Sequence, residues 1–144
     1  MTHYGKVETV LLVEDNPDDV FLMRRAFKKA RIEARLLIVT DGKKAVSYLE
    51  GTGEYGDRQL YPLPGLVFLD LKLPFLHGFV VLAWIRKQVH LHDVHVIILT
   101  SSMEDQDREK AAALGAPYLI KPPTPAMLLE AISSLGLSLE PSVN

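Results

Sequence analysis

Five polar residues stand where short apolar runs of the sequence end, and their types suit phosphoryl chemistry. Glu14 and Asp15 follow one such run, Asp70 closes a second, Thr100 a third and Lys121 a fourth. Apolar runs of this kind are typical of strands in a parallel sheet, whose carboxyl ends meet at one edge. We therefore expect all five side chains to converge on a single site.

Such a site would hold both a metal ion and a phosphoryl group. Three converging carboxylates repel one another unless a cation lies between them. The set contains no His or Cys, and oxygen-only ligation favours Mg²⁺, which accepts one or two carboxylates and keeps several waters. A fixed lysine ammonium and a hydroxyl beside the metal supply the charge and donors that phosphoryl oxygens require. Asp70 can then act as a nucleophile, because carboxylates form acyl phosphates.

Each of these residues also has an ordinary structural interpretation. A single Asp at a strand end is more often a turn former or a helix cap than a catalyst. A Lys-Pro pair often begins a loop, and Thr is common in strands. The functional interpretation therefore depends on the joint placement of these residues at the ends of four different predicted strands.

The elements that position these residues alternate along the chain. Runs rich in Val, Ile and Leu, with little polar alternation, predict five strands buried on both faces; these are Thr9–Glu14, Leu36–Thr40, Leu66–Asp70, Val94–Thr100 and Tyr118–Lys121. Amphipathic stretches predict five helices. The first begins after Asn16, the second covers Lys43–Leu49, and the third follows Gly78 with Val81, Ile85 and Val89 on one face. The fourth covers Glu104–Leu114, and the fifth ends before Gly136. The alternation predicts an α/β fold with a parallel sheet and helices on both of its faces.

Composition narrows the class of protein further. The chain has 144 residues, no Cys, and 16 Lys and Arg against 18 Asp and Glu, a formal net charge of −2. The length fits one domain, which we place at 7–136, with a short C-terminal tail at 137–144. The absence of Cys excludes disulfides and thiol chemistry, and the charge lacks the basic character of nucleic-acid-binding proteins. No apolar run has the length of a signal peptide or a membrane span. We expect a cytoplasmic protein that contacts neither nucleic acid nor membrane.

The sequence resembles the receiver domains of bacterial two-component response regulators over nearly its whole length. The motifs that carry the resemblance stand in the family's order; they are Leu12–Asn16, Leu69–Pro74 followed by Gly78, Leu99–Ser101, and Lys121-Pro122. The resemblance implies a flavodoxin-like (βα)5 fold with strand order 2-1-3-4-5 and a cis peptide before Pro122. It also implies a phosphoprotein switch, which accepts a phosphoryl group from a sensor histidine kinase and signals to a protein partner through a conformational change.

The resemblance assigns a role to each motif residue. Asp70 is the phosphoacceptor, Lys121 contacts the phosphoryl group, and Thr100 bonds to that group after a shift of the following loop. Tyr118 matches the family's aromatic switch position, although a half-buried strand aromatic is an equal alternative. The implied ligands of Mg²⁺ are Glu14, Asp15, Asp70 and the backbone carbonyl of Lys72.

Two residues depart from the common receiver pattern. His77 stands before Gly78, where many receivers carry an acid, and Lys72 places a cationic side chain two residues beyond the phosphoacceptor. Because that second position influences dephosphorylation in the family, we hypothesise that Lys72 and Ser102 set the lifetime of the aspartyl phosphate.

The predicted partners follow from weaker signals. A long connection leads from Tyr48 to Pro64 and contains the element Gly53-Glu54-Tyr55. It is similar to small receivers that partner phytochrome-type kinases, and a generic glycine-rich insertion is the alternative. A homodimer through the fourth helix, fifth strand and fifth helix is a further expectation from the family; these are Glu104–Leu114, Tyr118–Lys121 and Pro125–Leu135.

Three other interpretations compete with a stand-alone phosphoacceptor. A phosphatase or phosphotransferase of the haloacid-dehalogenase type also uses a strand-end Asp and Mg²⁺, but it needs a second acid two residues on, where this chain has Lys72. A degenerate receiver that only binds partners would have lost Asp70 or Lys121. His90, His92 and His95 form a histidine cluster whose irregular spacing gives little support for a transition-metal site.

Overall fold

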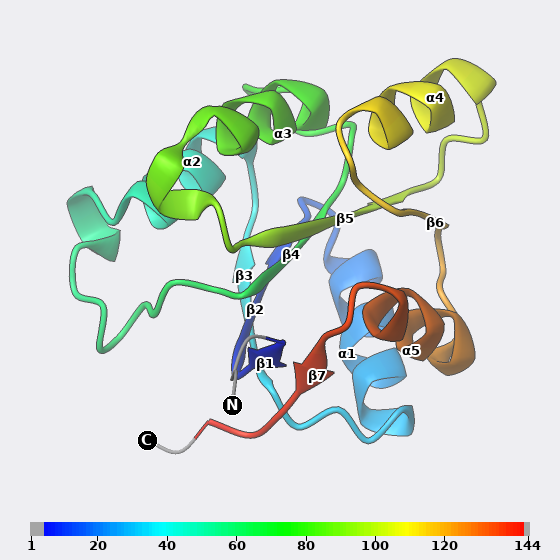
Figure 1. The fold of residues 1–144 in the computed structure, drawn as a ribbon, viewed down its shortest axis with the longest axis horizontal. Coiled ribbons are helices and arrows are strands. Elements are labelled where there is room, and N and C mark those ends of the chain that lie inside the picture. Colours follow the sequence, from blue (N-terminus) through cyan, green and yellow to red (C-terminus); the bar gives the residue numbers. More distant parts are fainter. Residues whose placement is uncertain (1–4, 143–144) are drawn as a thin grey trace.

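A five-stranded parallel sheet forms the centre of the molecule in the computed structural model, which describes residues 5–142 (Figure 1). Its strands are β2 (Thr9–Val13), β3 (Arg35–Val39), β4 (Leu66–Leu69), β5 (His95–Thr100) and β6 (Tyr118–Ile120). They lie in the order β3-β2-β4-β5-β6 and all pairs are parallel. When only the five strands of this sheet are numbered along the chain, the order is 2-1-3-4-5. The predicted flavodoxin-like topology is therefore confirmed.

The five main helices cover both faces of this sheet. They are α1 (Pro17–Lys29), α2 (Gly42–Glu50), α3 (Gly78–Lys87), α4 (Asp105–Ala113) and α5 (Pro125–Ser134). Helices α1 and α5 pack over one face, and α2, α3 and α4 lie over the other (Figure 1). The central strands β2 and β4 are buried along their whole length between these two layers. That double burial explains why their sequences are continuously apolar.

Local capping signals explain where most helices begin. Asn16 accepts a hydrogen bond from the backbone of Asp18 at 2.8 Å, and Pro17 starts the first turn of α1. Asp41 caps α2 through Lys44, and Thr124 caps α5 through Met127. These side chains satisfy backbone N–H groups that a helix start leaves without an internal partner.

The third helix is shorter than its apolar spacing predicts. Helix α3 ends at Lys87, because Gln88 adopts an extended backbone with φ −90° and ψ 117°. Val89 lies instead in a short 3-10 helix, η2 (Val89–Leu91), and is 90% exposed. The expectation that Val89 continues the buried face of this helix is therefore wrong.

The predicted C-terminal tail contains a strand. Ser138–Leu139 forms β7, which pairs in parallel with β1 (Lys6–Val7), and the backbone N–H of Glu140 donates to the carbonyl of Val7 at 2.8 Å. Leu137 and Leu139 pack against the core on the side of α1 and α5. The predicted tail at 137–144 is thus ordered over 138–140, where it pairs with β1; residues 143 and 144 lie outside the described part of the chain.

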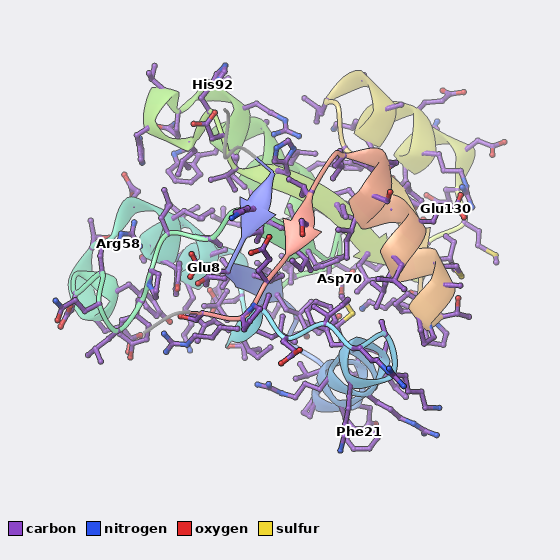
Figure 2. The ribbon with its side chains drawn as sticks, turned by 60° about the horizontal axis from the view of Figure 1, so that its bottom comes forward. Glu8, Phe21, Arg58, Asp70, His92 and Glu130 are labelled. Atoms are coloured by element: carbon purple, nitrogen blue, oxygen red, sulfur yellow. The ribbon has the colours of Figure 1, made fainter. Side chains whose placement is uncertain are left out.

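The connection after α2 is an ordered aromatic cluster. Its short 3-10 helix, η1 (Gly53–Tyr55), places Tyr55 within 5.1 Å, ring to ring, of both Tyr48 and Tyr61. Arg58 donates hydrogen bonds to the carbonyls of Tyr48 and Leu49, at 2.8 and 2.9 Å, and so caps the end of α2. Burial raises the pKa of the Tyr48 hydroxyl to about 12, and that hydroxyl donates to the carbonyl of Pro62. Figure 2 shows Arg58 well apart from Asp70.

Among residues 5–142, no helix has the length and apolar character to cross a membrane.

Candidate functional site

Strand register brings the predicted site residues to one edge of the sheet. Val13, the last residue of β2, pairs with Leu69, the last residue of β4, so Glu14 and Asp70 follow neighbouring strand ends. Thr100 pairs with Ile120, and the backbone N–H of Lys121 donates to the carbonyl of Thr100 at 2.9 Å. The lysine therefore leaves β6 at the same edge. The Lys121-Pro122 peptide is cis, as the resemblance implied.

The ammonium group of Lys121 lies among three carboxylates. Its Nζ is 2.5 Å from Oε1 of Glu14 and 2.9 Å from Oδ2 of Asp70. A third carboxylate, Asp19 of α1, accepts from the same Nζ at 3.0 Å. The side chain of Lys121 is 10% exposed, so these contacts occur largely away from water. Charge-assisted hydrogen bonds of this kind are roughly twice as strong as neutral ones.

Burial and neighbouring charge shift the proton affinities of this group. Burial raises the pKa of Glu14; the contact with Lys121 opposes that shift, and the charge of Asp70 adds to it. Burial also disfavours the charged form of Lys121, but its contacts with Glu14, Asp70 and Asp19 outweigh burial and raise its pKa. The site thus combines a stable cation with carboxylates that are crowded together.

This arrangement fits a small divalent cation. Glu14, Asp15 and Asp70 each offer a carboxylate oxygen, and these oxygens lie within 4.8 Å of one another. Oε1 of Glu14 is buried and has no aligned hydrogen bond, although it is close to Lys121. Asp15 is exposed and opens the cluster to solvent, from which water ligands can reach a metal. An all-oxygen set with access to water suits Mg²⁺ or a similar hard cation.

A chain of hydrogen bonds connects Thr100 with Tyr118 through the loop after β5. The hydroxyl oxygen of Thr100 accepts from the backbone N–H of Ser102 at 3.3 Å. The carbonyl of Ser102 accepts from the Tyr118 hydroxyl at 2.7 Å, and the Ser102 hydroxyl donates to Asp107 at 2.6 Å. Arg108 lies over the Tyr118 ring at 5.0 Å. A movement of the Ser102 backbone would therefore change the contacts of both Thr100 and Tyr118.

The loop after Asp70 is held by Gly78 and His77. Nδ1 of His77 accepts from the backbone of Phe79 at 3.1 Å, so this residue caps α3. The backbone N–H of Gly78 donates to the carbonyl of Leu71 at 2.8 Å. The side chain of Lys72 is exposed on the same loop.

A Gly78→Ala substitution is expected to lower the free energy of unfolding by about 1–3 kcal/mol, the usual cost of overpacking. A Cβ at this position would lie 2.2 Å from the carbonyl oxygen of Asp70 and 2.7 Å from Cα of Leu71, so the backbone beside the site must move. Urea denaturation monitored by circular dichroism measures the effect. Gly56→Ala is the matched control: its Cβ would meet nothing closer than 3.4 Å, and its φ is −70°. Equal stability of the two variants would contradict the close approach at Gly78.

The histidine cluster lies away from this site. His95 begins β5 and pairs with Leu66 at the start of β4, the end opposite to Asp70. His92 is exposed, and Figure 2 shows it well apart from Asp70. Burial, with the charge of Arg86, lowers the pKa of His95. Within residues 5–142 the three histidines do not form a metal-binding group.

The sequence analysis missed Asp19 and the role of the Ser102 peptide. Asp19 carries a signal only as an acid in the first turn of a helix, where the helix dipole favours negative charge. Its contact with Lys121 depends on how α1 crosses the sheet. The Ser102 contacts depend on the path of a loop, which residue types alone do not predict.

The fold and site together define a doubly wound α/β domain with an acidic, lysine-paired site at the carboxyl edge of its sheet. The family model described as "Response regulator receiver domain" matches residues 10–133. The chain therefore belongs to the response regulator receiver family, whose members act in two-component signalling with histidine kinases.

Individual relatives agree with this assignment. The chain is 40% identical over 114 residues to the probable methanogenesis regulatory protein FilR2 of Methanothrix harundinacea, covering 78% of this chain and 71% of FilR2. It is 37% identical over 100 residues to the response regulator Rcp1 of Synechocystis, covering 69% and 66% of the two chains. The Mn²⁺-bound structure of Rcp1 superposes with a TM-score of 0.73 at 32% identity, covering 89% and 91%. The bacteriophytochrome response regulator AtBRR superposes with a TM-score of 0.81 at 35% identity, covering 96% and 99%.

Proposed function

We propose that this protein is a phosphoacceptor switch, in which Asp70 receives a phosphoryl group from a histidine kinase with the help of Mg²⁺. The observation that carries the proposal is the 2.9 Å contact between Asp70 and Lys121 beside the three-carboxylate cluster. This contact places a nucleophilic carboxylate, a fixed cation and candidate metal ligands around one small volume. The Mn²⁺-bound form of the related Rcp1 supports the binding of a divalent ion.

The transfer step follows from the chemistry of these groups. An oxygen of Asp70 attacks the phosphorus of a kinase phosphohistidine, the P–O bond forms as the P–N bond breaks, and the released imidazole nitrogen keeps the electron pair and takes up a proton. Lys121 donates to a phosphoryl oxygen and balances its charge. When bound to Glu14, Asp15, Asp70 and the carbonyl of Lys72, Mg²⁺ would neutralise the charge that builds up on the phosphoryl oxygens.

The loop after β5 would carry the signal. The Thr100 hydroxyl can donate its O–H to the phosphoryl group, and a shift of its oxygen toward that group would disturb the contact that it accepts from the N–H of Ser102, whose carbonyl accepts from the Tyr118 hydroxyl. The proposal therefore includes Thr100 and Tyr118 as the switch pair, and their shared contact with the backbone of one residue, Ser102, supports it. The exposed Lys72 and the buried Ser102 remain our candidates for setting the lifetime of the phosphoryl group.

The proposed partner is a sensor kinase of the phytochrome-like type, supported by the likeness to AtBRR and Rcp1. We also propose a cytoplasmic location, no direct contact with nucleic acid, and a homodimer through α4, β6 and α5. The dimer is carried over from the family alone. Light scattering with and without beryllofluoride tests it.

A hydrolytic enzyme of the haloacid-dehalogenase type is less well supported. Such an enzyme needs an acid two residues beyond the nucleophile to protonate the leaving group. The corresponding residue is Lys72, whose side chain is exposed. We therefore propose that the protein does not turn over free phosphoesters.

Incubation with acetyl phosphate and Mg²⁺ tests the main proposal. Intact mass spectrometry should show one added phosphoryl group on the wild type, and none on Asp70→Asn or in the presence of EDTA. Asp93→Asn, which removes an exposed acid at the opposite edge of the sheet, should behave like the wild type. Labelling that persists in Asp70→Asn, or that is independent of metal, would refute the assignment.

A further inference from the structure

Asp19 is the contact of Lys121 that lies outside the carboxylate cluster. Its Oδ2 accepts from Nζ of Lys121 at 3.0 Å, from the first turn of α1 rather than from a strand end. Its side chain is 28% exposed, compared with 2% for Glu14 and 8% for Asp70. Within the described residues, Asp19 is not part of the group whose oxygens lie within 4.8 Å of one another. Asp19 is therefore a partner of the ammonium and not a candidate metal ligand.

The ammonium of Lys121 is closely surrounded by carboxylates in this structure. An ammonium group has three N–H donors and no acceptor. Two of them form hydrogen bonds to Asp19 and Asp70, and Oε1 of Glu14 lies 2.5 Å from the same nitrogen. A phosphoryl oxygen that approaches Lys121 therefore competes with three carboxylates that already surround the ammonium.

Charge distinguishes Asp19 from the other two carboxylates. A divalent cation held by Glu14, Asp15 and Asp70 would offset two of the three negative charges of those groups. Asp19, outside that cluster, would keep its negative charge beside Lys121. That charge repels an anion that binds to Lys121. Asp19 lies 3.0 Å from the same ammonium, well inside the Debye length at physiological salt, so this repulsion is little screened.

We propose that Asp19 competes with the phosphoryl group for contact with Lys121. This competition weakens the binding of the phosphoryl group at Asp70 and so limits the fraction of the protein that is phosphorylated. Asp19 is a positioning residue in this scheme: it acts through Lys121 and takes no part in bond making. The inference rests on the proposed function, because it requires a phosphoryl group to contact Lys121. It adds a residue that sets how strongly this site holds its anion.

Beryllofluoride, a stable stand-in for the phosphoryl group, provides the test at saturating Mg²⁺. Isothermal titration calorimetry should show that Asp19→Asn binds beryllofluoride about three- to tenfold more tightly than the wild type, as expected for removal of one partly exposed charge-assisted contact. Asp19→Glu keeps the charge and should stay within about twofold of the wild type. The gain in Asp19→Asn should shrink as the salt concentration rises, because salt screens partly exposed charges.

Asp18→Asn is the matched control. Asp18 is the preceding acid in the same helical turn, is exposed, and its removal changes the helix dipole environment equally. It should leave beryllofluoride affinity unchanged. Unchanged or weaker binding by Asp19→Asn, with a thermal unfolding midpoint like that of the wild type, would overturn the inference. If the wild type itself fails to bind beryllofluoride, or if Asp70→Asn still binds it, the proposed function fails instead.

Discussion

Replacing Lys121 with methionine is expected to lower the free energy of unfolding by about 2–4 kcal/mol in EDTA, and at the same time to tighten Mg²⁺ binding about tenfold. The stability falls because Glu14 and Asp70, both buried, lose the cation that separates their charges. Metal affinity rises because the competing positive charge leaves the cluster. Urea denaturation in EDTA and calorimetric titration with Mg²⁺ measure the two effects.

Magnesium should restore part of the stability lost in Lys121→Met, since a ligand that binds only the folded state stabilises it by mass action. The same variant should bind beryllofluoride poorly, because the donor for the anion is gone. Lys28→Met is the control: this exposed lysine lies in the last turn of α1, so its loss should lower stability by less than about 1 kcal/mol and leave Mg²⁺ affinity unchanged. A Lys121→Met variant as stable as the wild type in EDTA would show that the ion pairs contribute little.

Glu14→Gln is expected to have the opposite pair of effects. Mg²⁺ affinity should fall by about tenfold or more, because a buried carboxylate ligand becomes a neutral amide. Stability in EDTA should stay unchanged or rise by up to about 1 kcal/mol. The reason lies in the raised pKa of Glu14, which burial causes and the charge of Asp70 reinforces. When an acid has a raised pKa in the folded state, the protein loses stability as the pH rises through that pKa, because the folded state disfavours the charged form. Glutamine cannot ionise, so Glu14→Gln removes this loss at neutral pH.

The control for Glu14→Gln is Asp15→Asn, which removes an exposed carboxylate from the same cluster. It should weaken Mg²⁺ binding while leaving stability in EDTA unchanged. The comparison separates the loss of a ligand from the relief of a buried charge. Strong destabilisation of Glu14→Gln in EDTA would mean that the contact with Lys121 outweighs burial.

Together these two variants describe a site whose requirements for stability and for binding are opposed. Lys121 holds the carboxylates together without metal, and the crowding of Glu14 and Asp70 favours a divalent ion when one is present. Functional sites commonly carry such a local cost, which the rest of the core offsets. In this protein, the apolar contacts of the two buried layers on either side of β2 and β4 supply the stability that offsets this cost.

The positions of the strand-end residues could be predicted from the sequence because they depend on local burial. Each apolar run is buried on both faces, and a run of that kind stops where the chain leaves the core. Glu14, Asp70 and Lys121 stand directly after β2, β4 and β6, so parallel pairing alone brings them to one edge. The predicted ranges end one residue too late at β2, β4 and β6, because Glu14, Asp70 and Lys121 follow the ladder instead of belonging to it.

Some features were decided by contacts between distant parts of the chain. The pairing of β1 with β7 joins Lys6–Val7 to Ser138–Leu139, and two-residue strands leave no periodic signal in the sequence. The end of α3 depends on the extended backbone of Gln88, although the apolar spacing continues to Val89. Local pattern therefore misjudged both segments.

The amino-acid sequence by itself determined the α/β class, the strand order through the family's motifs, and the set of polar residues at the carboxyl edge. Only the tertiary structure decided that Asp19 shares the ammonium of Lys121, and that the backbone of Ser102 joins Thr100 to Tyr118. The physical reason is that a strand end is set by local burial, which residue types reveal. The direction of a helix side chain or a loop carbonyl is set by how separate elements pack, and that packing is a property of the whole chain.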